Sequence, residues 1–343
     1  MKRSVIYFSI GLVILLLFVV NSICFAQANT WTKKADMPTP RSNISSAVLN
    51  GKIIVAGGML KDFSSSSAVD EYDPKTDAWV KKGNMSTARD SIAVGVINGK
   101  FYAIGGIFGC DEPTPLVEEY DPATDKWTKK ADMPTARLLA SASIVNGKIY
   151  VIGGSIGHGD QNCSWWSGVS TVEEYDPAAD KWIKKTDMPT ARACLSTCAV
   201  NGKIYAIGGF SFGVFSTVEE YDPATDKWTK KKDMPTKRCN FASATVNGKI
   251  YAIGGETGVF SPILEEYDPI KDEWTKKADM PTGRSKIACS AVNGKLYVIG
   301  GFTEQSPVLS LVEAYDTGFS DATTSFKAEG KMPLTWAEIK TRY

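Results

Sequence analysis

Residues Arg137–Gly154 read RLLASASIVNGKIYVIGG, and residues Val172–Met188 read VEEYDPAADKWIKKTDM. A loop separates the two segments, and together they form one unit of an internal repeat. The glycine pair that ends the first segment occurs six times, at residues 57–58, 105–106, 153–154, 208–209, 254–255 and 300–301. A fixed period of about 20 to 50 residues is the signature of a repeat architecture. Residues 27–316 are therefore predicted to be six copies of one structural unit.

The spacing inside each unit is strict. An arginine is followed nine residues later by Asn-Gly, and the glycine pair follows seven residues after that asparagine. A tyrosine precedes a tryptophan by seven residues, and a methionine follows the tryptophan by six. The arginines are Arg41, Arg89, Arg137, Arg192, Arg238 and Arg284. All length variation lies between the glycine pair and the tyrosine.

Two hairpins are predicted in each unit. Asn-Gly between apolar runs is a strong hairpin signal, because both residues tolerate the positive φ of a type I′ turn. In the third unit this predicts strands at 140–145 and 148–152. The Tyr-Asp-Pro-x-Thr-Asp-x-Trp segment predicts a second hairpin, in which Asp121 and Asp125 hydrogen-bond local backbone amides. Each unit therefore has four short antiparallel strands.

The first strands are rich in small residues, as in Ala140–Ile144 (ASASI), whereas the third and fourth strands carry the Tyr and Trp. Strands around a common axis crowd at its centre, so small residues belong innermost and aromatics outside. On these motifs the chain resembles the kelch-repeat β-propellers over about 290 residues. The resemblance implies an all-β, six-bladed β-propeller with four antiparallel strands per blade and the first strand innermost.

The N-terminal segment has the layout of a secretory signal peptide. Lys2 and Arg3 precede the apolar run Val5–Val20, and small residues follow. We expect a signal peptide at 1–26, with cleavage after Ala26 or Ala28, and a secreted or periplasmic protein. A retained membrane anchor is the alternative.

The propeller is predicted to span residues 30–316, and two segments compete to complete its sixth blade. That unit reaches Tyr315 but lacks the tryptophan seven residues later. Residues 30–38, which include Trp31, read as an outer strand with no preceding unit, so we expect them to close blade six. The rival is Phe326–Met332, inside a C-terminal extension at 317–343.

The charge balance indicates which class of partner to expect. Without Lys2 and Arg3, 37 basic residues face 38 acidic ones, a net charge of −1 with His158 neutral. Such a surface argues against nucleic acid as the partner, and we expect a monomer.

Six cysteines follow residue 26. Cys110 and Cys163 are the disulfide candidates, and Cys194 with Cys239 is a possible second bridge. Cys194, Cys198, Cys239 and Cys289 are otherwise expected to be buried free thiols of the innermost strands.

Because successive strands of a unit run in opposite directions, the Asn-Gly and Asp-Pro turns lie on one face of the propeller. The Met-Pro-Thr-x-Arg linkers and post-glycine loops lie on the other. The post-glycine loops all differ, so recognition is predicted there. The longest, Ser155–Ser170, contains Trp165 and Trp166, which can anchor a ligand or fold back over the channel. The residues after each arginine also vary and are predicted to open the central channel. From these positions the candidate ligand-binding residues are Asn43, Ser91, Asn240 and Lys286.

The six arginines have two interpretations. A ring of guanidinium groups near the channel mouth can bind a carboxylate or other anion. Alternatively, each arginine ties loops together or pairs with a carboxylate of a neighbouring blade. The Glu-Glu before each Tyr and the Lys-Lys after each Trp are expected to be a solvated rim.

No catalytic motif, cofactor or metal site is predicted. His158, Asp160 and Cys163 resemble metal ligands only weakly, and kelch copper oxidases need two histidines where this chain has one. The leading hypothesis is an exported, non-enzymatic scaffold that binds a protein or glycan. The alternative is a sugar-acid mutarotase or epimerase resembling the periplasmic kelch sialate mutarotases. It requires a deep mouth pocket with an arginine and an acid from Asp90, Asp111, Glu112 or Glu256.

Overall fold

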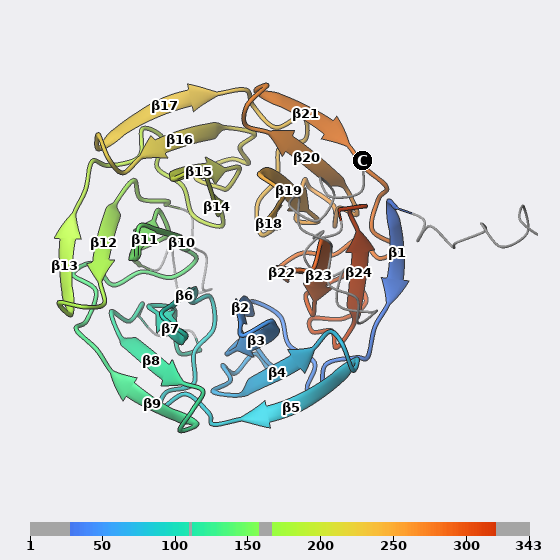
Figure 1. The fold of residues 1–343 in the computed structure, drawn as a ribbon, viewed down its shortest axis with the longest axis horizontal. Helices are drawn as coiled ribbons and strands as arrows, with labels where there is room; N and C mark the ends of the chain where they lie inside the picture. The colour runs from blue at the N-terminus through green and yellow to red at the C-terminus, as the bar shows by residue number, and fades with distance from the viewer. Residues whose placement is uncertain (1–27, 110–111, 158–166, 320–343) are drawn as a thin grey trace, which may run out of the picture.

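The computed structural model describes residues 28–109, 112–157 and 167–319, and these fold as the predicted six-bladed β-propeller. Their strands form six separate antiparallel sheets of four strands each. Figure 1 shows the sheets standing side by side around a central axis, with the first strand of each innermost. The described residues contain no helix long and apolar enough to cross a membrane.

Four sets of strands succeed one another from the axis outward. The innermost strands are β2 (Ser45–Leu49), β6 (Ala93–Ile97), β10 (Ser141–Val145), β14 (Ser196–Val200), β18 (Ala242–Val246) and β22 (Ala288–Val292). The second strands are β3 (Lys52–Ala56), β7 (Lys100–Ile104), β11 (Lys148–Ile152), β15 (Lys203–Ile207), β19 (Lys249–Ile253) and β23 (Lys295–Ile299). The third strands are β4 (Val69–Asp73), β8 (Val117–Asp121), β12 (Val172–Asp176), β16 (Val218–Asp222), β20 (Leu264–Asp268) and β24 (Val312–Asp316). The outermost are β5 (Ala78–Lys82), β9 (Lys126–Lys129), β13 (Lys181–Lys184), β17 (Lys227–Lys231), β21 (Glu273–Lys276) and β1 (Thr30–Lys33).

The Asn-Gly turns set the register of the inner hairpins. In blade three Asn146 and Gly147 have φ of 50° and 72°, so both adopt the left-handed conformation of a type I′ turn. Val145 then pairs with Lys148, and the register runs to Ser141 opposite Ile152. The second strand matches its prediction, and the first begins one residue later than predicted.

The hydrophobic core lies between the blades. Each second strand is buried along its apolar run, because one neighbouring blade packs on each of its two faces. One core cluster, for example, combines Ile53 and Tyr72 of blade one with Ile299 and Val312 of blade six. The six blades therefore stabilise one another through six such layers.

The chain ends meet in blade six, where β1 is the outermost strand. It pairs antiparallel with β24, and Trp31 lies opposite Tyr315 as Trp182 lies opposite Tyr175 in blade three. Figure 1 shows β1 on the outer side of β24, between the outer strands of blades five and one. The rival segment 326–332 lies outside the described residues.

An outer latch links each blade to the linker before it. In blade three Asp180 accepts hydrogen bonds from the Tyr175 hydroxyl (2.5 Å) and from the backbone N–H of Ala131 (2.9 Å). The Trp182 indole N–H donates to the carbonyl oxygen of Ala131 (2.9 Å). The second aspartate of each Asp-Pro hairpin was expected to bind local amides, and that expectation is wrong. Its backbone partner lies in the linker that precedes the blade.

Blade six builds the same latch from the other end of the chain. Asn29 takes the aspartate position with φ of 66°, and it accepts a hydrogen bond from the Tyr315 hydroxyl (2.8 Å). The Trp31 indole N–H donates to the carbonyl oxygen of Ala278 (2.9 Å). The N-terminal segment therefore supplies both latch residues, Asn29 just before β1 and Trp31 within it.

Trp31→Ala is predicted to lower the free energy of unfolding by about 2 to 4 kcal/mol, because it removes the aromatic contact and the latch of the closing strand. Urea unfolding measures the change. The matched comparison is deletion of residues 326–332. A larger loss of stability from that deletion than from Trp31→Ala would contradict closure by the N-terminal strand.

The latch also predicts acid sensitivity. The hydrogen bond from Tyr175, followed by that from Ala131, lowers the pKa of Asp180. A carboxylate with a lowered folded-state pKa contributes stability that is present above its unfolded pKa of about 3.9 and lost as the pH falls through the folded pKa. Asp180→Asn should therefore lower the free energy of unfolding at pH 7. It should also make the free energies of unfolding at pH 7 and pH 3, both measured with urea, more similar than they are in the wild type. Asp187→Asn, an exposed partner of Lys184, is the control. Equal pH dependence of the wild type and Asp180→Asn would refute this account.

Candidate functional site

One face of the propeller carries the loops that differ in length between blades. Here the residue after each arginine pairs with the first residue of the post-glycine loop, as Leu138 does with Ser155 and Cys239 with Glu256. The six linkers and the six post-glycine loops therefore lie together, and we call this surface the variable face.

A closed ring of backbone hydrogen bonds surrounds the channel on the variable face. We call it the mouth ring, and its members from blade one to blade six are Asn43, Ser91, Leu139, Cys194, Asn240 and Lys286. Each N–H donates to the carbonyl oxygen of the member in the preceding blade, with N···O distances of 2.8 to 3.1 Å. Asn43 donates to Lys286, so the circle is complete. The ring joins every blade to both neighbours at the axis.

All six members of the mouth ring have φ between 50° and 55°. For residues other than Gly and Asn this left-handed conformation costs about 1 to 2 kcal/mol, so the closed ring holds four of its members in a strained backbone state: Ser91, Leu139, Cys194 and Lys286. Such strain is concentrated at functional sites more often than elsewhere. The four ligand-binding candidates Asn43, Ser91, Asn240 and Lys286 are brought together here.

The mouth ring is polarised. Leu139 and Cys194 are adjacent and apolar, whereas the other four members are polar and contiguous. Behind them the buried Asp90 carboxylate accepts hydrogen bonds from the hydroxyls of Ser65 (2.6 Å) and Ser91 (2.8 Å). Burial raises the pKa of Asp90, and these two hydroxyls oppose that shift. The Lys286 ammonium lies 4.8 Å from the ring centre of Phe302.

The mouth is shallow. Its cavity is about 100 Å³ and is floored by the side chains that follow the ring, among them Ile44, Ile92, Leu195 and Phe241. This volume is below the roughly 300 to 1,000 Å³ typical of small-molecule sites. Beneath the floor, a channel cavity of about 190 Å³ is lined by hydroxyls that bridge adjacent blades, such as Ser196 to Ser243 (2.6 Å).

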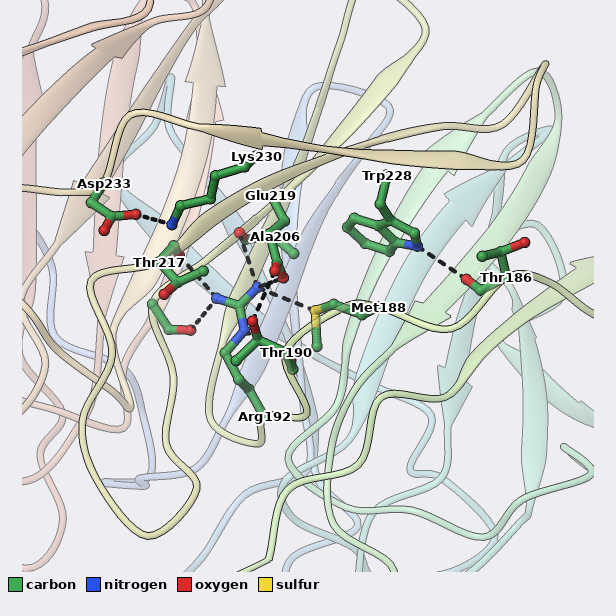
Figure 2. A network of polar contacts seen from close by, with 11 residues as sticks. Thr186, Met188, Thr190, Arg192, Ala206, Thr217, Glu219, Trp228, Lys230 and Asp233 are labelled. Atoms are coloured by element: carbon green, nitrogen blue, oxygen red, sulfur yellow. Dashed lines mark hydrogen bonds and ion pairs between the residues drawn. The ribbon is translucent and has the colours of Figure 1, made fainter.

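The six repeat arginines lie away from the mouth and are buried. Figure 2 shows Arg192 surrounded by its partners in blade four. Its Nη2 contacts a Glu219 carboxylate oxygen at 2.7 Å, and Nη1 donates to the carbonyl oxygens of Gly208 (2.7 Å) and Thr217 (2.9 Å). Gly208 and Thr217 stand at the two ends of the post-glycine loop. Arg192 therefore clamps the base of the loop while leaving its tip free to vary.

Four other blades repeat this loop clamp. Arg41, Arg89, Arg137 and Arg238 each bind the first glycine of the pair and the residue just before the third strand. Blade six differs, because Arg284 binds Glu313 through Nη1 (2.7 Å) and the Val298 carbonyl oxygen through Nη2 (3.1 Å). Each of the six repeat arginines is paired with a carboxylate.

This geometry corrects three expectations. The arginines are at most 1% exposed and do not line the mouth, so they form no anion-binding ring. The carboxylate comes from the third strand of the same blade, not from a neighbouring one. The acidic residue two positions before each Tyr, such as Glu219 at 3% exposed, is buried in this pair and is not part of a solvated rim.

The cysteine expectations are corrected in part. Cys194 and Cys239 are free, so the second bridge is absent, and both precede the innermost strands at the mouth. Cys198 and Cys289 are free thiols of β14 and β22. Burial raises the pKa of the Cys239 thiol to about 12, so it is protonated at neutral pH.

Several predicted residues lie outside the described residues: Cys110, Asp111, His158, Asp160, Cys163, Trp165 and Trp166. Within the described ranges no group of three or more His, Cys, Asp or Glu side chains could hold a metal ion.

A set of exposed apolar side chains on the variable face was not predicted. These side chains lie on the post-glycine loops of blades one to five: Phe63 (61% exposed), Phe108 (53%), Ile156 (53%), Phe212 (82%) and Val259 (66%). They make up five of the eight exposed large apolar side chains in the described ranges; Val80, Ile183 and Ile270 lie elsewhere. Each of these loops contains more than one large apolar residue, and the structure shows which of them is exposed.

Together these features define a six-bladed propeller with one copied face and one variable face. The KLHDC2/KLHL20/DRC7 Kelch-repeats domain model matches residues 86–255 and 130–301, which together span more than half of the chain. The Kelch motif model matches residues 40–86 and 283–320. The chain belongs to the kelch-repeat family.

Individual relatives are similar over shorter stretches or in fold alone. Kelch-like protein 40 of Xenopus tropicalis and that of Xenopus laevis are each 44% identical over 43 residues, which is 12% of this chain and 7% of the relative. The match thus covers a small part of those longer proteins. A solved structure titled "Structure of YjhT" aligns with a TM-score of 0.70 and 18% identity, covering 80% of this chain and 95% of that chain.

Arg192→Met is predicted to lower the free energy of unfolding by about 3 to 5 kcal/mol, because it leaves the buried Glu219 carboxylate without its partner. Lys230→Ala, which breaks the exposed pair with Asp233 drawn in Figure 2, should change stability by less than about 0.5 kcal/mol. Denaturant unfolding compares the two variants. Similar small effects from both would show that the buried pair does not hold the loop base.

Proposed function

We propose that this kelch propeller is a binding scaffold whose variable face holds a protein partner. The observation that carries the proposal is the set of exposed apolar loop side chains. Exposed aromatic and aliphatic side chains on one face of a scaffold can serve as anchors for a protein partner. The buried clamps beneath these loops present them with little loss of conformational freedom on binding.

The chemistry of the described loops favours a protein over a glycan. Phe63, Phe108, Phe212 and Val259 offer apolar surface and few hydrogen-bonding groups. Trp165 and Trp166, which could stack on a sugar, remain a prediction from the sequence. The glycan alternative therefore depends on residues 158–166 and is tested separately below.

The sugar-acid mutarotase alternative lacks part of its required site in the described residues. The mouth cavity is small, and its lining provides Lys286 as a cation but no arginine. Asp90 and Glu256 are close to the mouth, but Glu256 accepts a hydrogen bond from Ser285 (2.7 Å). A sugar-acid turnover assay with Lys286→Met tests this alternative directly.

The binding proposal is tested with a displayed protein-fragment library and a glycan array, both probed with purified protein. Fragments selected on the wild type should bind Phe63→Ser/Phe212→Ser at least about 30-fold more weakly, as expected for loss of two exposed aromatic anchors. Ile270→Ser is the matched control, since Ile270 is at least as exposed (86%) and lies on the opposite face.

Each outcome separates the candidates. Binding lost equally in the Ile270→Ser control would overturn the variable face as the site. Binding on the glycan array alone, abolished by Trp165→Ala/Trp166→Ala, would replace the protein partner with a glycan.

Export is a further part of the proposal, supported by Lys2, Arg3 and the apolar run Val5–Val20. N-terminal sequencing of protein recovered outside the cytoplasm should find Gln27 or Asn29 as the first residue. Recovery of an intact Met1 in a membrane fraction would favour the anchored form instead.

A further inference from the structure

A groove on the variable face separates blades five and six. The post-glycine loop of blade five forms one wall with Val259 and Phe260, and that of blade six forms the other with Glu304 and Gln305. The exposed Pro281 of the intervening linker forms part of the floor. Its volume of about 380 Å³ is well above the 100 Å³ of the mouth and lies within the range of ligand sites.

The blade-five wall is built by a departure from the repeat. The position before the repeat arginine is Pro, Ala or Lys in the other blades but Gly283 here. A Cβ at Gly283 would lie 2.7 Å from the carbonyl oxygen of Phe260, so glycine lets this loop pack closely on the linker. The Phe260 ring in turn lies 5.4 Å from that of Phe302. These contacts hold Phe260 in place.

The blade-six wall is a tight turn. The N–H of Thr303 donates to the carbonyl oxygen of Ser306 (2.9 Å), and the N–H of Ser306 donates back to Thr303 (3.3 Å). Glu304 and Gln305 are the two residues at its tip, and both are exposed. The turn therefore presents these side chains on a rigid base.

Glu304 and Gln305 have no hydrogen-bond or ion-pair partner among residues 28–109, 112–157 and 167–319. Other acids of the variable face are engaged: Asp62 accepts from Ser64 (2.6 Å), and Asp90 and Glu256 accept from serines. The nearby Arg284 is buried in its pair with Glu313, and Lys286 lies over Phe302. The groove thus offers an uncompensated carboxylate beside an aromatic ring and an exposed valine.

This combination fits a cationic side chain beside an apolar one. A carboxylate and an aromatic ring both attract ammonium or guanidinium groups, and Val259 with Pro281 provides apolar contact for a neighbouring residue. The Gln305 amide can both donate to and accept from a peptide group. We propose that this groove binds an extended polypeptide segment in which a Lys or Arg lies next to an apolar residue. The proposal rests on the proposed protein-binding function and specifies its partner.

The probe is a labelled hexapeptide, Ac-Ala-Ala-Arg-Leu-Ala-Ala-NH₂, and its analogue with citrulline in place of arginine, which keeps the shape and removes the charge. Fluorescence anisotropy measures binding to the folded full-length protein. The arginine peptide should bind at least about tenfold more tightly than the citrulline peptide at low salt, and the difference should shrink as salt screens the pair. Glu304→Gln should remove that tenfold preference.

Two controls make the result specific. Glu273→Gln removes an exposed carboxylate of β21, on the outer rim of blade five, and should leave binding unchanged. Gly283→Ala should weaken both peptides by displacing the Phe260 loop, with thermal melting as the check on folding. If the preference for the arginine peptide persists in Glu304→Gln, the proposal that this groove binds the cationic side chain is overturned. Argininamide binding as tightly as the hexapeptide would show a small-cation site and overturn the polypeptide proposal.

Failure of the groove is distinguishable from failure of the proposed function. If library-selected fragments lose binding in Phe63→Ser/Phe212→Ser but not in Glu304→Gln, the variable face binds protein elsewhere and the groove proposal falls alone. If neither variant affects them, both proposals fall.

Discussion

The ion pair between each repeat arginine and a third-strand carboxylate supports the whole variable face. A charge buried without a partner is strongly destabilising, so the Arg192 position and the Glu219 position must be kept together in every copy. In blades one to five the same guanidinium group also binds both ends of the post-glycine loop. Because the loop base is held by backbone carbonyl oxygens, its tip can change without disturbing the sheet. Copied scaffold and variable surface follow from one interaction.

The remaining order comes from contacts between blades. Apolar layers lie between neighbouring sheets, latches such as Asp180 with Ala131 join them at the rim, and the mouth ring joins them at the axis. None of these three sets of contacts is complete until the sixth blade meets the first. Asn29 and Trp31 complete the last latch, so the N-terminal strand is a structural part of the propeller. The members other than Asn43 and Asn240 are strained individually, and the backbone hydrogen bonds of the closed ring hold them in that conformation.

Much of the fold was predictable because its signals are local and repeated. Asn146-Gly147 specifies a turn whatever surrounds it, and six copies make the architecture unambiguous. The sequence left open whether Arg192 lines the channel mouth or ties loops together, and the structure shows that it ties the two ends of a loop. Its partner Glu219 was not predictable from spacing, since 27 residues separate the two and two strands must pair before they meet. The apolar tips at Phe63 and Phe212 were missed for a related reason. A single phenylalanine in a loop is as consistent with a buried anchor as with an exposed one.

The sequence alone determined that there are six blades, where their turns fall and which face varies. It did so because hairpin geometry depends on a few adjacent residues. Only the tertiary structure decided which charged residues are buried, and it alone placed Asn43, Ser91, Asn240 and Lys286 in a single ring with Leu139 and Cys194. It also revealed the groove that Gly283 permits between blades five and six. Burial and proximity depend on residues from different blades, and these meet only when the ring has closed.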